Sequence, residues 1–386
     1  MKFLHLADLH IGKRVNDFSM IEDQRAILEQ IVAIGSAQQI EAVFLAGDIY
    51  DKSQPAVEAI ELFDDFLNQW KELGIPVFLI SGNHDSPERI HYMSRLLKKN
   101  QIYIAGVFRG EMDYVEWTDS YGPLRIYMLP FVKPGLVRHY LNEEIENYDQ
   151  AIEAVINHTL IDDSLRNVLI GHQFVIGQDS MPEQSDSENI SVGGVDQVYA
   201  NRFERFDYVA LGHLHAPQKI GYPHVRYAGS PLKYSASEVN QKKSVTIVSL
   251  LEKGKIDIQQ VALRPLREML SIRGSLEEIL SQAGSTPGWN GRWSEDYIHA
   301  NLTDEKIYDP VGKLRVYYPN LMSITFSNQY VQNITPERRK LEEDIQNRSM
   351  MDLFQDFFRL QNQKDLSKEQ LLIVKESIDR MEKEEL

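Results

Sequence analysis

Short apolar runs alternate with longer amphipathic stretches over the first two-thirds of the chain. Runs rich in β-branched and aromatic residues are typical of strands, whereas apolar residues spaced three or four apart are typical of helices. The helical spacing occurs over residues 20–36 and 57–73. Strands are predicted at residues 3–6, 42–46, 76–80, 167–170, 208–211 and 225–228. This alternation predicts an α/β fold in which a β-sandwich is flanked by helices.

Two segments depart from that alternation. Residues 115–117 and 124–129 are strand-like and enclose the turn-forming segment 119–123, so we expect an antiparallel hairpin there. The polar stretch 178–194 has no periodicity. A loop of that length inside a compact domain is uncommon and is usually functional or mobile.

The pattern changes near residue 265 and again near residue 329. Strand-like residues 245–250 and 256–261 are followed by a helix near 276–282 and by strands at 297–302 and 321–326. The last segment has only helical spacing, and its apolar stripes can pack on their own domain or dock into a groove of a partner. We therefore predict a large α/β domain over 1–265, a small α+β capping domain over 266–328 and a helical segment over 329–386.

Composition restricts the class of protein but does not identify its function. The chain has 386 residues, of which 42% are hydrophobic and 25% are charged, and it has no cysteine. These values predict a globular protein without disulfides or thiolate zinc sites. We expect no signal peptide and no membrane segment, and we expect the protein in the cytoplasm. The net charge of −16 argues against a nonspecific DNA-coating protein but allows local phosphate binding at a metal site.

Five short acidic and histidine-containing motifs each follow an apolar run. One Asp-x-His or His-x-His pair is a weak signal, but five such segments at predicted strand ends favour one shared site. Oxygen and imidazole ligands from several strand ends can hold two divalent cations around a phosphate. The motifs are Asp8-Leu9-His10, Gly47-Asp48, Gly82-Asn83-His84-Asp85, Gly171-His172 and Gly212-His213-Leu214-His215.

Spacing suggests a role for each predicted metal ligand. Asp8 and His10 are two residues apart, so on an extended strand end they project to the same side and could share one metal. The two oxygens of Asp48 suit it to bridge two cations, and Asn83 offers a neutral amide oxygen. The remaining ligands are expected from His172, His213 and His215.

We assign His84 and Asp85 to catalysis rather than to metal binding. His84 is expected to transfer a proton or to position the phosphate, and Asp85 is expected to orient the His84 ring through a hydrogen bond. Other titratable residues are expected to be structural. His5 is predicted to lie in the core, and Asp51 is predicted to support its loop. Glu22 and Asp23 are predicted to be solvated charges on a helix. Surface or structural positions are expected for His91, His139, His158, His224 and His299.

The motifs carry a resemblance to the calcineurin-like metallophosphoesterase superfamily. The residues that carry it are Leu6 to Lys13, Ala46 to Asp51, Ser81 to Ser86 and Leu211 to His215. Residues 129–134, 185–188, 191–195 and 227–235 are in addition similar to the nuclease subunits of bacterial DNA repair complexes. The match spans about residues 1–240, and beyond it the likeness is mainly one of size and position.

The resemblance implies which residues share each metal. One ion would be held by Asp8, His10, Asp48 and His215, and the other by Asp48, Asn83, His172 and His213. The implied cofactors are two divalent ions, manganese as the usual one and magnesium as the alternative. The implied activities are 3′–5′ exonuclease and single-strand endonuclease. The implied partners are DNA, a second copy of the chain, and a coiled-coil ATPase that binds the C-terminal helices.

Two other functions stay open at this point. One is hydrolysis of a small nucleotide or another phosphodiester by the same centre, and the other is a non-catalytic scaffold that binds DNA ends for an ATPase. Candidate contacts to DNA phosphates near the motif loops are equally well explained as solvated charges. These candidates are Lys13, Arg14, Lys52, Arg89, Arg95 and Lys233.

Overall fold

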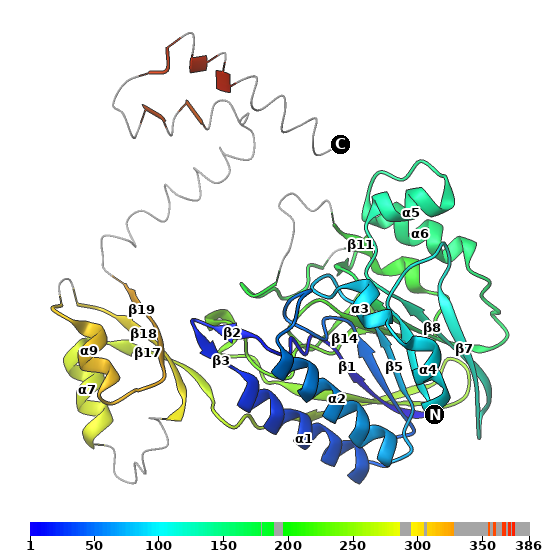
Figure 1. Cartoon of the computed structure of the whole chain (residues 1–386), viewed down its shortest axis with the longest axis horizontal. Helices are drawn as coiled ribbons and strands as arrows, with labels where there is room; N and C mark the ends of the chain where they lie inside the picture. Colours follow the sequence, from blue (N-terminus) through cyan, green and yellow to red (C-terminus); the bar gives the residue numbers. More distant parts are fainter. Residues whose placement is uncertain are drawn as a thin grey trace. The chain divides into compact units, whose positions relative to one another are not determined.

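The computed structural model describes residues 1–178, 180–188, 196–285, 295–304 and 307–327. It also describes short pieces of the C-terminal segment at 354–355, 358–359, 365–367, 370–371 and 373–374. The rest of the predicted helical segment 329–386 lies outside the described residues. Figure 1 gives the element labels used below.

The first of two six-stranded sheets holds both ends of the large domain. Four of its strands, β1, β4, β5 and β6, are parallel to one another. The other two, β15 and β16, are antiparallel to their neighbours. The order is β16 (Ile256–Ala262), β15 (Ser244–Leu250), β1 (Lys2–Leu6), β4 (Ala42–Ala46), β5 (Val77–Ile80) and β6 (Ile102–Ala105). The carboxyl ends of β1, β4 and β5 therefore meet at one edge of this sheet.

The second six-stranded sheet has the same mixed character. Its strands β8, β9, β12 and β14 are parallel, and its two edge strands are antiparallel to their neighbours. The order is β13 (Gln218–Ile220), β14 (Tyr222–Tyr227), β12 (Tyr208–Gly212), β9 (Arg166–His172), β8 (Gly122–Leu129) and β7 (Asp113–Asp119). The predicted hairpin is confirmed as β7 and β8.

The sheets face each other across an apolar layer. Because side chains alternate along a strand, each strand contributes to two layers. In β4, Ala42, Phe44 and Ala46 belong to the core between the sheets, whereas Val43 and Leu45 belong to the core on the outer face. The same alternation in β12 places Tyr208 between the sheets. The result is a β-sandwich with an outer apolar face on each sheet.

Helices cover those outer faces. Helices α1 (Ile21–Ala37) and α2 (Val57–Glu72) pack on the first sheet through residues such as Ile31 and Phe66, as Figure 1 shows. Helix α6 (Tyr148–His158) packs on the second sheet through Ile152 and Val155, next to α5 (Pro134–Leu141). The predicted α/β sandwich flanked by helices is therefore confirmed.

Shorter elements connect these layers. Two-stranded sheets pair β2 (Arg14–Val15) with β3 (Phe18–Ser19), and β10 (Val175–Ile176) with β11 (Val198–Tyr199). Helices α3 (Pro87–His91) and α4 (Ser94–Leu97) lead from the third motif to β6. Three 3₁₀ turns, η1 (Lys98–Asn100), η2 (Ala200–Phe203) and η3 (Ala236–Glu238), complete the described large domain.

The described part of the predicted cap is also α+β. It has a three-stranded sheet in the order β17 (Met269–Gly274), β18 (Tyr297–Leu302) and β19 (Leu321–Phe326), with helices α7 (Leu276–Ser285) and α9 (Pro310–Arg315). The chain divides into two compact units, and the first unit includes Met1–Ile272. The domain boundaries at 265 and 328 stay a prediction. No described helix has both the length and the apolar character that crossing a bilayer requires.

Candidate metal centre

The five motifs lie at the carboxyl ends of five parallel strands. Asp8 and His10 follow β1, Asp48 follows β4, and Asn83 follows β5 in the first sheet. In the second sheet His172 ends β9, while His213 and His215 follow β12. Because β9 and β12 are paired neighbours and the two sheets face each other, these strand ends converge.

The backbone of the motif loops is unusual. Asp8, His10 and Asp48 have φ values of 53°, 45° and 49°, in the left-handed region that residues with a Cβ rarely adopt. His213 also has a positive φ of 107°. Such conformations cost about 1–3 kcal/mol each and persist only where the surrounding structure enforces them. Their concentration in the motif loops is typical of a functional site.

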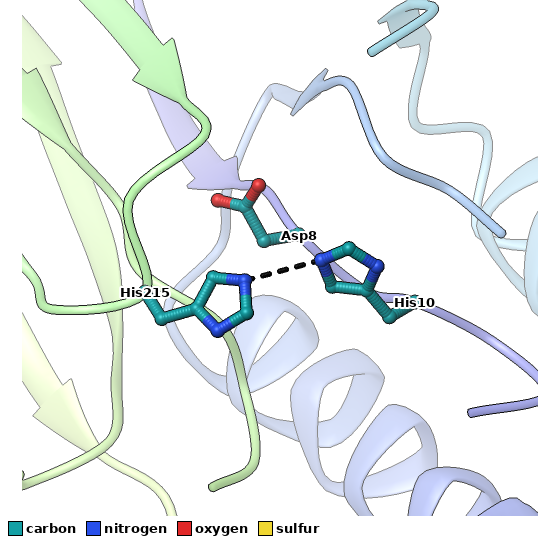
Figure 2. Close-up of side chains that lie close together, drawn as sticks. All are labelled: Asp8, His10 and His215. Carbon is teal, nitrogen blue, oxygen red and sulfur yellow. Dashed lines mark hydrogen bonds between the residues drawn. The ribbon is translucent and has the colours of Figure 1, made fainter. Parts of the chain in front are cut away.

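The first cluster joins Asp8, His10 and His215. One ligand atom from each of the three lies within 4.8 Å of the others. The Nε2 atoms of His10 and His215 are 3.1 Å apart, and Figure 2 shows these ring nitrogens pointing toward one another beside Asp8. All three residues are buried. Two imidazole nitrogens that face each other at this distance are suited to bind one cation together.

The second cluster joins Asp48, Asn83, His172 and His213. The amide oxygen of Asn83 lies 3.0 Å from His172 Nε2 and 3.1 Å from His213 Nδ1. Asp48 Oδ2 lies 3.4 Å from His172 Nε2. The other ring nitrogen of His172 lies 2.7 Å from the Ala46 carbonyl oxygen, to which it can donate, so Nε2 can turn to the cluster.

Asp48 stands between the two clusters. Its Oδ2 is 3.7 Å from His10 Nε2 and 3.4 Å from His172 Nε2. A further group of ligand atoms within 4.8 Å of one another contains Asp8, Asp48 and His172. This position suits a carboxylate that contacts two cations.

Burial and charge set the protonation of these groups. Burial lowers the pKa of His10 well below its ordinary value and that of His213 to about 3, so both rings are neutral and have a lone pair to offer. Burial raises the pKa of Asp8, whereas the neighbouring imidazoles hold the pKa of Asp48 low against burial. Despite burial, the Asp48 charge raises the pKa of His172 to about 9, and a bound cation would displace that proton.

The donor set fits a pair of divalent cations. The atoms that face the two clusters are imidazole nitrogens, carboxylate oxygens and one amide oxygen. Carboxylate, amide and imidazole groups together suit first-row divalent ions, and carboxylates and amides suit magnesium. The buried His and Asp clusters are therefore consistent with a dimetal site.

His84 lies at the edge of this centre. Its backbone N–H donates to Asp48 Oδ1 at 2.9 Å, and its ring lies 4.8 Å from the His10 ring. The residue is half-buried. A histidine that is close to both clusters and open to solvent can reach a bound phosphate.

The Asp85 carboxylate faces the backbone of the motif loops. The Asp85 carboxylate accepts three backbone N–H groups, from Ile49 at 3.1 Å, Tyr50 at 3.0 Å and Gly82 at 2.9 Å. The atom that faces His84 Nδ1, at 3.0 Å, is the carbonyl oxygen of Asp51. Asp85 therefore connects the loops that follow β4 and β5, and the Asp51 carbonyl oxygen is a second candidate for the group that orients His84. The predicted role of Asp85 stays a prediction.

Predictions for the other titratable residues are partly confirmed. His5 is buried and lies 3.0 Å from the Tyr208 hydroxyl, as expected of a core histidine. Asp51 supports its loop through Lys13 Nζ at 2.7 Å. The expectation for Asp23 is wrong because this residue is buried and pairs with Arg267 at 2.8 Å.

Sequence reasoning assigned no role to three residues next to His215. Glu238 Oε1 lies 3.1 Å from His215 Nδ1, Ser187 Oγ lies 2.8 Å from the same atom, and Glu188 Oε1 accepts the His215 N–H at 2.6 Å. Ser187 and Glu188 belong to the long polar stretch, whose length was a signal of function. Nothing in the local sequence marks Glu238.

Two family models match the chain. The calcineurin-like phosphoesterase model matches residues 1–217. A model described as the type 5 capsule protein repressor C-terminal domain, with the short name SbcD_C, matches residues 265–362. The first match covers more than half of the chain and includes all seven predicted metal ligands.

Two curated relatives are similar over most of their length. The D subunit of nuclease SbcCD from Staphylococcus epidermidis is 36% identical over 331 residues, which cover 84% of this chain and 85% of that protein. The protein of the same name from Staphylococcus saprophyticus is 34% identical over 333 residues, with 84% of each chain covered.

Two solved structures match the chain at low similarity. A protein of Thermus thermophilus gives a TM-score of 0.36 at 12% identity, covering 67% of this chain and 98% of its own. A dimetal phosphatase from Danio rerio gives a TM-score of 0.41 at 12% identity, covering 69% and 98%. Because both TM-scores are below 0.5, the assignment of the chain to a family does not rest on these two structures. From the family models and the relatives, the chain belongs to the calcineurin-like phosphoesterase family and, within it, to the SbcD nuclease subunits.

Proposed function

We propose that this chain is a nuclease subunit that hydrolyses DNA phosphodiesters at a two-metal centre, in the repair of double-strand breaks and the processing of hairpins. The observation that carries the proposal is the pair of adjacent clusters, in which Asp48 of the second cluster also lies 3.7 Å from His10 of the first. If these clusters held two divalent cations, the ions would supply the positive charge that hydrolysis of a phosphodiester requires.

The ligand assignment follows the two clusters. Asp8, His10, Asp48 and His215 hold one ion, and Asp48, Asn83, His172 and His213 hold the other. Manganese is the proposed ion, with magnesium as the alternative. When bound, the two ions neutralise the phosphate charge and lower the pKa of the attacking water.

The remaining steps belong to the side chains. His84 contacts the phosphate or protonates the leaving sugar oxygen, and its ring is oriented by the Asp51 carbonyl oxygen 3.0 Å from Nδ1. Asp85 acts through the backbone by holding the loops that carry Asp48 and Asn83. It is a positioning residue.

The test compares three variants in a manganese-dependent assay on linear DNA. His84→Ala is expected to keep two bound ions but to lower turnover about 100-fold or more, because general acid catalysis is lost. Asp48→Asn is expected to bind fewer than two ions by elemental analysis. His139→Ala, an exposed histidine on α5, is the matched control and is expected to match the parent.

Two results would contradict this proposal. Unchanged turnover in His84→Ala removes that residue from the mechanism, and two retained ions in Asp48→Asn remove the bridging role. End-labelled and circular single-stranded DNA then test the proposed 3′–5′ exonuclease and single-strand endonuclease activities. An enzyme that acts on small phosphodiesters would have a higher kcat/KM for a nucleotide ester than for DNA. A non-catalytic scaffold would cleave neither substrate.

Contacts to the DNA backbone are proposed for exposed cations near the motif loops. Arg14, Lys52, Arg89 and Arg95 are exposed. Lys13 and Lys233 are weaker candidates because they pair with Asp51 and Glu268, each at 2.7 Å. Several phosphate contacts make DNA affinity fall steeply with salt, so a flat salt response would count against them.

A homodimer is the proposed assembly of this protein. Large apolar side chains are exposed on α2, at Val57 and Ile60, and around α4, at Tyr92, Met93 and Leu96. Single exposed apolar side chains are common, but three of them within residues 92–96 favour an interaction surface there. Leu96→Glu is expected to yield monomers in sedimentation experiments, whereas Leu160→Glu, at another exposed leucine, is the control and is expected to stay dimeric.

Both relatives are named as the D subunit of nuclease SbcCD. We propose that this chain likewise binds an SbcC-type coiled-coil ATPase through its C-terminal segment and forms a heterotetramer with it. Co-purification of the full chain with such an ATPase tests this. A variant truncated before residue 329 is expected to lose the partner while it keeps manganese-dependent hydrolysis of a nucleotide ester; a complex that survives truncation would disprove this docking site.

A further inference from the structure

His215 is held from the side that faces away from the metal centre. Its Nε2 points to His10, as Figure 2 shows, at a distance of 3.1 Å. Its Nδ1 lies 3.1 Å from Glu238 Oε1 and 2.8 Å from Ser187 Oγ. A ring that donates from Nδ1 to a carboxylate must present the Nε2 lone pair at its opposite end.

The carboxylate that faces His215 is fully buried. Glu238 has 0% of its surface exposed, and Lys243, with 6% exposed, places Nζ 2.6 Å from Glu238 Oε2. Lys243 Nζ also lies 2.9 Å from the His215 carbonyl oxygen and 2.8 Å from Ser230 Oγ. A buried ion pair is seldom retained for stability alone, because apolar residues of similar volume stabilise a core as well or better.

The same residues connect the centre to the polar loop. Ser187 Oγ donates to Glu238 Oε1 at 2.5 Å, and Glu188 accepts the His215 backbone N–H at 2.6 Å. Ser185 N–H donates to Glu188 Oε2 at 2.9 Å. Segment 185–188 thus contacts both the side chain and the backbone of His215, although the segment and His215 are far apart in sequence.

We propose that Glu238, with Lys243 as its counter-ion, is the positioning residue of the metal ligand His215, and that Ser187 and Glu188 couple segment 185–188 to metal occupancy. This inference rests on the proposed two-metal function. Glu238 fixes the tautomer and direction of the His215 ring and increases its basicity as a ligand. Lys243 keeps the Glu238 carboxylate charged and anchors the His215 backbone.

The first experiment measures Mn²⁺ binding by titration calorimetry and by electron paramagnetic resonance. Glu238→Gln keeps the shape but removes the charge, and Glu238→Ala removes the group. We expect the weaker of the two Mn²⁺ affinities to fall by about 10- to 100-fold, as for other carboxylates behind a histidine ligand, with partial recovery in Glu238→Asp. Glu204→Gln, whose carboxylate pairs with Tyr222 on the surface, is the matched control and is expected to bind as the parent does.

The second experiment follows the loop and uses a milder variant. A glutamate-specific protease cleaves after Glu188, and Mn²⁺ is expected to slow that cleavage several-fold in the parent. Ser187→Ala, which removes only a hydroxyl from a half-buried residue, is expected to abolish the protection without unfolding the protein. It keeps the inference testable where a Glu238 variant does not fold.

The possible results separate the two proposals. A parent protein that binds no Mn²⁺ overturns both the proposed function and this inference. A parent that binds two ions, with Glu238 variants of equal affinity, overturns the positioning role alone. Equal cleavage after Glu188 with and without Mn²⁺ overturns the coupling of segment 185–188.

Discussion

At the scale of single residues, the motif glycines decide whether the candidate ligands can converge. A Cβ on Gly82 would overlap the Asp48 carboxylate and its backbone nitrogen, and one on Gly212 would overlap the Ala46 carbonyl oxygen. These loops pass so close to one another that no side chain fits between them. Glycine at positions 82 and 212 is therefore a packing requirement of the centre.

The first prediction concerns Gly82→Ala. The added methyl group must displace Asp48, so we expect a loss of Mn²⁺ affinity of at least about 10-fold, comparable to the loss of a supporting group at a metal site. Titration calorimetry measures it. Gly135→Ala is the control, since no heavy atom lies within 4 Å of a Cβ there. Parent-like affinity in Gly82→Ala would show that the loops can separate without cost.

At the scale of elements, an ion pair fixes the hairpin of the second sheet. Asp119 ends β7, and its carboxylate contacts Arg166 Nη1 at 3.0 Å at the start of β9. Arg166 also donates to the Leu251 carbonyl oxygen at 3.0 Å. Both side chains are only 3% exposed. The pair thus joins the hairpin, β9 and the loop after β15.

The second prediction is a pH-dependent loss of stability in Asp119→Asn. Although burial opposes ionisation, hydrogen bonds from Arg166 and from the amino-terminal ammonium group of Met1 lower the pKa of Asp119 to about 2. A carboxyl group whose pKa is lower in the folded state stabilises the fold above its unfolded pKa of about 4, and this stabilisation is lost as the pH falls toward 2. Urea denaturation should show a loss of about 3 kcal/mol at pH 7 that shrinks below pH 4.

The control for this prediction is an exposed pair of the same type. Asp163 contacts Arg205 at 2.8 Å but is 65% exposed, so Asp163→Asn should cost less than about 1 kcal/mol. A loss in Asp119→Asn that stays constant from pH 7 to pH 2.5 would contradict the assigned cause. All samples contain a chelator, so that metal binding does not contribute.

At the scale of the whole molecule, a buried acid joins segments that are distant in sequence. Asp23 on α1 accepts a hydrogen bond from the Tyr297 hydroxyl at 2.7 Å and from Arg267 Nη1 at 2.8 Å. Glu22, its neighbour, contacts Arg267 Nη2 at 2.6 Å but is 71% exposed. One arginine therefore has a buried and an exposed partner side by side.

The third prediction uses that contrast. Asp23→Ala leaves Arg267 without its buried partner and should lower the free energy of unfolding by about 3–5 kcal/mol. Tyr297→Phe should cost about 1 kcal/mol, the contribution of one hydrogen bond. Glu22→Gln should cost less than about 1 kcal/mol. Equal losses in Asp23→Ala and Glu22→Gln, measured by urea denaturation, would show that burial does not set the difference.

Sequence reasoning reached the main strands and the seven candidate ligands for a common reason. Apolar runs identify buried strands, and parallel strands of facing sheets end at the same edge. The strand β6 was missed because it is a short edge strand in which Tyr103 and Ile104 are half-buried, so its apolar signal is weak.

The roles of charged side chains were harder to predict. Asp23 follows the helical pattern of a solvated charge, and it is buried only because Arg267 and Tyr297 pack on that helix. Asp85 lies next to His84 in sequence, but its carboxylate turns to three backbone amides. The local sequence shows which polar groups are present but does not show which groups they contact.

The sequence by itself determined the α/β sandwich and the set of acidic and imidazole groups at its strand ends, because periodicity and order along the chain are local properties. Only the tertiary structure decided that Asp48 lies near both His10 and His172, that the Asp51 carbonyl oxygen faces His84 Nδ1, and that Glu238 and Lys243 contact His215. These contacts join residues through space, and their distances depend on how the two sheets and their loops pack.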